Sequence, residues 1–146
     1  MFSLHPMRVG LGLVVLTTGF AAEAHDPGFS VMDIFVTPGR IDVSASVGST
    51  ALNAGPKGAS LMELRKGTEV VPISVARRDD VNDHPRISIR WDVDTRRSYV
   101  ARVQLDKEAF GHRVAVRIWK QDRTLLSEHL LSHRHPTFEI PGVSSD

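Results

Sequence analysis

Residues 40–47 read RIDVSASV, in which polar and apolar side chains alternate without a break. Successive side chains of a β-strand point to opposite faces, so this alternation places one face in a core and the other in water. The same period of two recurs in residues 71–75, 87–93, 99–105 and 114–118. Weaker strand signals lie at residues 30–36, 60–65, 124–131 and 137–140. The pattern predicts an all-β chain.

Turn-forming residues separate these runs. Gly, Pro, Asn and Asp gather at residues 37–39, 53–58, 66–67, 79–85, 94–97 and 121–123. Gly permits positive φ, Pro fixes φ, and Asp and Asn bond to nearby backbone groups. Short strands spaced by roughly ten residues are typical of a sandwich or barrel. We therefore expect an immunoglobulin-like β-sandwich of about seven to nine strands, with at most one helical turn, at residues 106–110.

The two tryptophans differ in phase. Trp91 follows the parity of Ile87 and Ile89, which predicts that it lies in the core. Trp119 is out of phase with Val116 and Ile118, so it is the better candidate for an exposed ring. Core packing is the commoner role of such a side chain, and a ligand-stacking platform is the alternative.

The first 24 residues have the three parts of a secretory signal peptide. Arg8 gives the positive charge, residues 9–20 form the apolar segment, and Ala22 and Ala24 form the cleavage site. An apolar run of this length is shorter than the ~20 residues that span a bilayer. We expect cleavage after Ala24 and export to the periplasm without membrane insertion. The expected domains are a signal peptide (1–24), a β-sandwich (25–141) and a disordered tail (142–146); an uncleaved anchor is the alternative.

Composition excludes some classes of function. The chain has no cysteine, so side-chain packing without disulfides must hold an exported domain together, which fits a bacterial periplasm. The net charge is +1 and the charges are interspersed, so nothing predicts nucleic-acid binding or a polybasic membrane patch.

Cleavage after Ala24 would leave His25 as the first residue of the mature chain. The freed α-amine, with a pKa near ~8, and the imidazole Nδ1 can chelate a metal together. A third nitrogen would complete a T-shaped site of the kind that favours copper(II). The alternative is a plain turn, because Asp26, Pro27 and Gly28 follow directly.

Three further histidines cluster near the C-terminus: His129, His133 and His135. In an extended segment, the Cα atoms of His133 and His135 would lie about 6.6 Å apart, which suits two ligands of one ion. His129 would join them only if the chain turns at Ser132. We predict His25, His133, His135 and His129 as metal ligands, with copper or nickel as the metal; a solvated loop is the alternative.

The other motifs give weaker signals. Residues 79–84 (DDVNDH) hold oxygen donors that suit calcium, but the pattern lacks the Gly and terminal Glu of an EF-hand loop, so we expect a charged hairpin loop. The sequence contains no cysteine nucleophile, no G-x-S-x-G elbow and no Gly-rich phosphate loop. We therefore expect no enzymatic activity; an oxidative copper enzyme built on His25 is the weakest alternative.

Two short motifs carry a family resemblance. Residues 25–28 (HDPG) follow the expected cleavage site and lead into a strand, and residues 111–119 open a later strand that is followed by residues 125–131 (LLSEHLL) and 138–141 (FEIP). This layout resembles the exported segment of HupE/UreJ-like membrane proteins. In that family the segment precedes a multi-helix membrane portion described as nickel-permease-like. The resemblance implies a periplasmic domain that works beside such a permease, and it mildly supports metal handling. Transport is not implied, because that family's transport residues lie in membrane helices that match nothing here.

Two functional hypotheses follow. One is a periplasmic, non-enzymatic binding or accessory domain that handles copper or nickel beside a membrane permease. The other is a metal-free structural or protein-interaction β-sandwich, because edge strands and exposed aromatic rings can supply the contact.

Overall fold

The computed structural model describes residues 29–46, 58–81, 84–105 and 112–144. These residues contain no helix and form ten strands: β1 (Phe29–Thr37), β2 (Arg40–Ser46), β3 (Met62–Lys66), β4 (Glu69–Val70), β5 (Val75–Val81), β6 (His84–Asp92), β7 (Tyr99–Val103), β8 (Arg113–Lys120), β9 (Leu125–Leu131) and β10 (Thr137–Ile140). The all-β prediction is confirmed. The predicted signal peptide, His25 and the helical turn at residues 106–110 lie outside the described residues. Among the described residues, no helical segment has the length and apolarity that membrane crossing requires.

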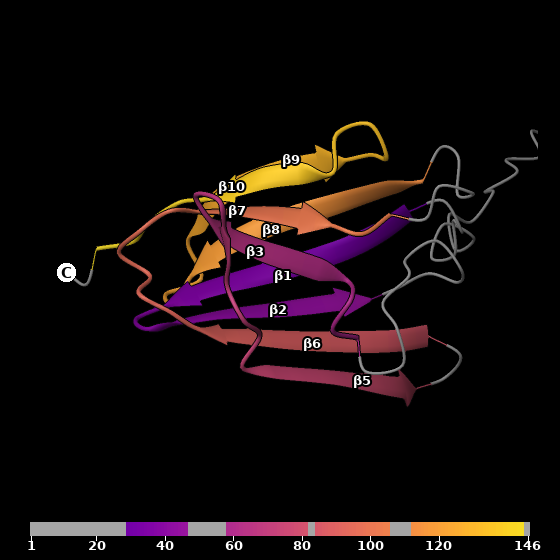
Figure 1. The fold of residues 1–146 in the computed structure, drawn as a ribbon. Coiled ribbons are helices and arrows are strands. Elements are labelled where there is room, and N and C mark those ends of the chain that lie inside the picture. Colours follow the sequence, from indigo (N-terminus) through magenta and orange to yellow (C-terminus); the bar gives the residue numbers. More distant parts are fainter. Residues whose placement is uncertain (1–28, 47–57, 82–83, 106–111, 145–146) are drawn as a thin grey trace, which may run out of the picture.

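The strands form two sheets that pack face to face, with β3 and β7 lying in front of β1 and β8 in the view of Figure 1. One sheet has six strands in the order β5-β6-β2-β1-β8-β9, and the other has four in the order β10-β7-β3-β4. Most neighbours are antiparallel, but β1 and β8 are parallel and place Asp33 opposite Arg117. This parallel pair brings the first and eighth strands side by side.

The inward-facing side chains of both sheets form one core. In the six-stranded sheet the buried apolar residues are Met32, Ile34, Val36, Ile41, Val43, Ala45, Ile87, Ile89, Trp91, Val114, Val116, Ile118 and Leu131. The four-stranded sheet contributes Met62, Leu64, Tyr99, Ala101, Val103, Phe138 and Ile140. The core is thus the apolar half of the alternation in the sequence, as the period of two predicts.

One predicted strand, over residues 71–75, is wrong. Residues 71–74 instead cross from β4 to β5, and the Ser74 N–H donates to the Arg90 carbonyl oxygen at 2.9 Å. Pro72 has no N–H for a ladder, which favours a connection here. Val71 and Ile73 still pack against the core, so burial rather than strand geometry explains their alternation.

The predicted loop at residues 79–85 is also shorter than expected. β5 continues to Val81 and β6 begins at His84, and these two residues lie opposite each other. Only residues 82 and 83 separate the strands, and they lie outside the described residues. The acidic segment therefore belongs mostly to a hairpin's strands rather than to its loop.

Two buried side chains, those of Thr95 and Tyr99, form hydrogen bonds with the backbone of the segments that connect the strands. Thr95 Oγ1 donates to the Thr37 carbonyl oxygen at 2.9 Å and accepts from the Gly39 N–H at 3.1 Å. The Thr95 carbonyl oxygen accepts from the Val143 N–H at 2.8 Å, two residues beyond the predicted end of the domain. The Tyr99 hydroxyl donates to the Asp94 carbonyl oxygen at 2.9 Å, a bond resembling the tyrosine corner of immunoglobulin-like sandwiches. The division into six and four strands differs from that of immunoglobulin domains, so the immunoglobulin-like topology stays a prediction.

Candidate functional site

The predicted metal ligands His133 and His135 lie in a tight turn, not in an extended segment. Ser132 and His135 bridge the turn through two backbone hydrogen bonds, of 3.2 and 3.0 Å. Both histidines are exposed. The strand-rise spacing that predicted their separation therefore does not apply, although one short turn still carries both imidazoles.

His129 lies apart from that pair, on the inward-facing side of β9. Its ring centroid lies 5.5 Å from that of Phe138 on β10, and its Nε2 is buried with no hydrogen-bond partner in the described structure. The chain does turn at Ser132, as joining the three histidines required. Even so, the described residues contain no group of three His, Cys, Asp or Glu side chains that could hold a metal. His25 is outside the described residues, so the four-histidine site stays a prediction.

The topology does bring two segments that concern the predicted ligands to one end of the sandwich: the start of β1, which follows His25, and the turn that carries His133 and His135. β1, β8 and β9 are neighbours, with Phe29 opposite Arg113 and Val114 opposite Leu131. The start of β1 and the turn after β9 therefore lie at the same end (Figure 1). His112 directly precedes β8 at this same end of the sandwich. It is buried, and its Nε2 lies 3.0 Å from the Ser30 hydroxyl oxygen.

The acidic segment considered for calcium does not converge. Asp79 and Asp80 are consecutive residues of β5, so their side chains point to opposite faces. Each pairs with an arginine two residues earlier: Arg77 Nε lies 3.1 Å from Asp79, and Arg78 Nε lies 3.1 Å from Asp80. These two carboxylates therefore form separate surface ion pairs.

A different site emerges on the outward-facing side of β1, β8 and β9. The strand registers align the outward side chains there in three rows that cross all three strands. The outer two rows are apolar and the middle row is charged: Val31, Ala115 and Leu130; Asp33, Arg117 and Glu128; Phe35, Trp119 and Leu125. Phe35, Leu125 and Leu130 are exposed by 37%, 41% and 63%. We call these nine residues the outer platform.

Asp33, Arg117 and Trp119 form the centre of the outer platform. Arg117 Nε and Nη2 donate to the two carboxylate oxygens of Asp33, each at 2.8 Å. Trp119 Nε1 donates to Asp33 Oδ1 at 2.9 Å, and the Arg117 guanidinium carbon lies 5.7 Å from the Trp119 ring centroid. That separation allows a cation–π interaction. One carboxylate thus fixes both the guanidinium and the indole.

The electrostatics agree with this geometry. Partial burial raises the pKa of Asp33, but the hydrogen bonds from Arg117 and Trp119 and the charge of Arg117 outweigh it and lower the pKa overall. The hydrogen bond to Asp33 likewise raises the pKa of Arg117, despite partial desolvation. Both groups are therefore charged across the neutral range, and the pair persists there.

The other half of the same sheet face is mostly polar, with Val75 of β5 as an exposed apolar residue opposite Arg90. There the outward side chains of β2 and β6 include Asp42, whose carboxylate pairs with Arg40 Nε at 2.7 Å and Arg90 Nε at 3.2 Å. Ser44 lies opposite Ser88 in the middle of this half. Exposed aromatic and large aliphatic side chains therefore concentrate on one half of the face, over β1, β8 and β9.

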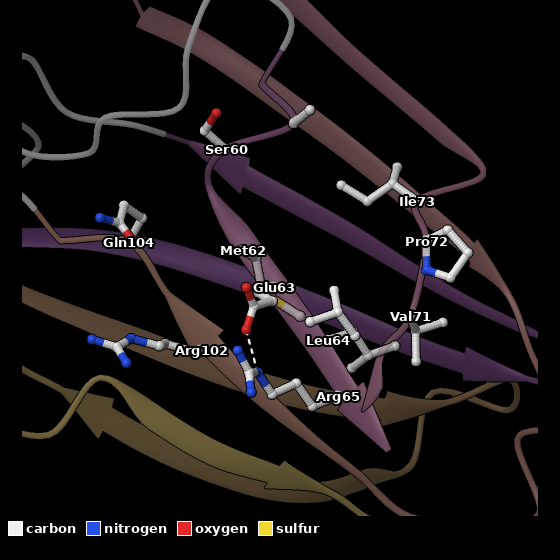
Figure 2. Close-up of a pocket in the computed structure, with 12 residues that line it drawn as sticks. Ser60, Met62, Glu63, Leu64, Arg65, Val71, Pro72, Ile73, Arg102 and Gln104 are labelled. Carbon is white, nitrogen blue, oxygen red and sulfur yellow. Dashed lines mark hydrogen bonds and ion pairs between the residues drawn. The ribbon is translucent and has the colours of Figure 1, made fainter. Parts of the chain in front are cut away.

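A surface pocket over the other sheet has a volume of about 440 Å³ and is shown in Figure 2. Glu63 and Arg65 of β3 form an ion pair in it, and Arg102 of β7 lies opposite Glu63 in the register. Val71 and Pro72 lie on the other side of β3 in this view. Arg65 and Arg102 are exposed and Glu63 is partly buried, so the two arginines of this pocket are well solvated and an ion pair here contributes little.

The alternation in the sequence predicted the outward position of Trp119 but not the ion pair that holds it. The predicted core position of Trp91 is confirmed at 0% exposure. Trp119 lies on the outward face, as its phase predicted, but its side chain is partly buried rather than exposed. The pairing of Asp33 with Arg117 was missed because the two residues are 84 positions apart. The available signal was the outward parity of Asp33 within β1 and of Arg117 within β8, but parity does not identify the neighbouring strand.

Comparison with protein-family models and with curated protein sequences gives no match.

Proposed function

We propose that this chain is an exported, non-enzymatic accessory domain that binds another protein through the outer platform. The observation that carries the proposal is that the outward-facing, partly buried side chains of Trp119 and Arg117 are both held in place by Asp33. Trp and Arg are enriched among the residues that dominate binding energy at protein interfaces. A side chain that is already fixed loses little conformational entropy on binding, which favours affinity.

The surroundings of this pair support the same function. Apolar rows, one of which contains Trp119, lie on both sides of the charged row, so a partner can exclude water around Arg117. Asp33 is already neutralised by Arg117, so covering it leaves no unpaired charge at the centre.

The partner that the sequence favours is a multi-helix membrane permease. The resemblance to the exported segment of HupE/UreJ-like proteins and the signal-peptide features of residues 1–24 support this proposal and a periplasmic location. The interspersed charge argues against nucleic acid as the partner.

Site-specific photo-cross-linking in the native host tests the proposal. A photoreactive residue in place of Leu125 should cross-link to one membrane protein, and the same residue in place of the outward-facing Ser88 should not. Trp119→Ala should reduce the Leu125 cross-link at least tenfold, at unchanged protein level. Equal cross-linking from both positions, or no effect of Trp119→Ala, would contradict the proposed function.

Metal handling is a second candidate, favoured by the common end of β1 and the turn after β9. His25 precedes Phe29 by four positions in the sequence, which is a reach of at most ~14 Å. Two strand spacings, from β1 to β9, amount to ~10 Å. The chain is therefore long enough to bring His25 to the turn that carries His133 and His135.

Calorimetry of the correctly cleaved protein with copper(II) and nickel(II) tests this candidate. We expect binding that weakens at least tenfold in His133→Ala and His135→Ala, with His129→Ala as a control for the inward-facing histidine. Binding no tighter than millimolar, or equal binding by all variants, would rule it out.

A further inference from the structure

The outer edge of β9 is an open strand edge in the described structure. β9 pairs with β8 on one side, and no described strand pairs with it on the other. The Lys120 N–H donates to the Thr124 carbonyl oxygen at 2.9 Å, so Lys120 directs its backbone groups toward β9. Backbone groups alternate in direction along a strand, so Val114, Val116 and Ile118 do the same.

The residues opposite them on β9 therefore bond to β8, and the residues between point away. Val116 lies opposite His129 and Ile118 opposite Ser127. By the same alternation, the N–H and C=O groups of Glu128 and Leu130 point outward from the sheet edge. The side chains of these two residues belong to the outer platform, so a strand added here would extend its rows.

The two edges of the six-stranded sheet differ in their protection. β5, at the other edge, carries four consecutive charges, from Arg77 to Asp80. Charged side chains of this kind block strand addition in many β proteins. β9 has Glu128 as its one Asp, Glu, Lys or Arg residue. Leu130 is also the most exposed of the large apolar side chains in the described structure, at 63%.

Charge decides which strand fits this edge. An added strand with a basic side chain opposite Glu128 and an apolar one opposite Leu130 would compensate both residues, because directly opposite pairs interact most strongly. A second copy pairing through its own β9 brings no Lys or Arg. Antiparallel pairing about His129 would set Glu128 against Leu130, so the added strand would bring no basic side chain to the carboxylate, whose neighbour Arg117 is already paired with Asp33.

We infer that β9 is the docking strand for an extended, basic segment of the partner protein, which joins the six-stranded sheet by strand addition. This inference rests on the proposed function and specifies its partner: backbone hydrogen bonds to Glu128 and Leu130 give affinity. The basic residue opposite Glu128 and the apolar residue opposite Leu130 give specificity.

A capped peptide of sequence TVTKTVT is the probe, with TVTETVT as its charge-reversed control. In nuclear magnetic resonance titrations of the exported protein, TVTKTVT should shift the amide signals of Glu128 and Leu130 and protect these amides from exchange. TVTETVT should bind at least fivefold more weakly. Absence of binding by TVTKTVT up to millimolar concentration, or equal binding of both peptides, would overturn the inference.

Leu130→Pro removes the outward-facing N–H that strand addition needs, while Leu130→Thr keeps it. Leu130→Pro should weaken binding of TVTKTVT at least tenfold relative to Leu130→Thr. Circular dichroism should show that both variants keep the wild-type spectrum; should Leu130→Pro not fold, Glu128→Lys must reverse the preference between the two peptides. Concentration-dependent dimerisation that Leu130→Pro abolishes would assign the edge to a second copy and overturn the inference.

The cross-linking assay separates this inference from the proposed function. If Trp119→Ala removes the Leu125 cross-link but Leu130→Pro does not, the partner docks on the outer platform without strand addition. In that case the proposed function stands and the inference fails. If neither variant reduces the cross-link, the proposed function itself fails.

Discussion

Asp33 of β1 and Arg117 of β8 form a bidentate ion pair across two parallel strands, with both N–O distances at 2.8 Å. Such fork-to-fork pairs are stronger and more directional than single contacts. Arg117 is partly solvent-exposed, with 41% side-chain exposure, so screening by water reduces its contribution to stability. The pair therefore acts mainly to orient Arg117 and Trp119 on the surface.

Asp33→Asn should lower stability at neutral pH by about 1–2 kcal/mol, because it removes a charge-assisted pair at a partly exposed site. The folded pKa of Asp33 is lowered, so its stabilisation is fully present above the unfolded value near ~3.9 and is lost as the pH falls through the folded value. Urea unfolding at pH 7 and pH 2.5 should show a difference between wild type and variant that narrows in acid. Glu69→Gln, an exposed change in β4, is the control; a difference that is independent of pH would argue against this assignment.

Trp91 and Trp119 should respond in opposite ways to truncation. Trp91→Ala removes a fully buried indole ring, which has 0% exposure, and leaves a cavity. It should lower the free energy of unfolding by about 3–5 kcal/mol. Trp119→Ala removes an outward-facing ring and one hydrogen bond and should cost about 1–2 kcal/mol. Chemical denaturation measures both costs. The prediction fails if Trp119→Ala is the more destabilising variant.

Gly58→Ala should destabilise the domain more than Gly67→Ala. Both glycines have positive φ, of 78° and 61°, which an alanine adopts with strain. At Gly58 a Cβ would also lie 2.7 Å from Ile87 Cγ2, whereas at Gly67 it would meet nothing within 4 Å. We expect about 1 kcal/mol for Gly67→Ala and about 2–4 kcal/mol for Gly58→Ala. Thermal unfolding checks the order, and equal losses would show that the contact with Ile87 is unimportant.

Thr95→Val should cost about 1–3 kcal/mol, because it leaves the Gly39 N–H and the Thr37 carbonyl oxygen without the hydroxyl that joins them. Thr37→Val is the matched control, since Thr37 Oγ1 makes one long, exposed hydrogen bond of 3.4 Å to the Arg40 carbonyl oxygen. We expect a loss below about 0.5 kcal/mol for that control. Denaturant unfolding compares the two variants, and similar losses would contradict a connecting role for Thr95.

The sequence by itself determined the class of the fold and which side chains face the core. Alternation with period two is a local property of the extended backbone, so it assigned Trp91 to the core and Trp119 to the outward face without knowledge of any neighbour. It failed for residues 71–75, because Val71 and Ile73 are partly buried while their backbone crosses between the sheets.

The tertiary structure decided which strands are neighbours and therefore what the surface can bind. The parallel pairing of β1 with β8 joins Asp33 to Arg117, and the Ser132–His135 turn removes His133 and His135 from the extended geometry expected of them. Strand order depends on how all ten strands together bury their apolar faces, which no local pattern encodes. For that reason the sequence alone predicted an outward-facing aromatic ring, while the folded chain revealed that Trp119 is partly buried and which carboxylate holds it.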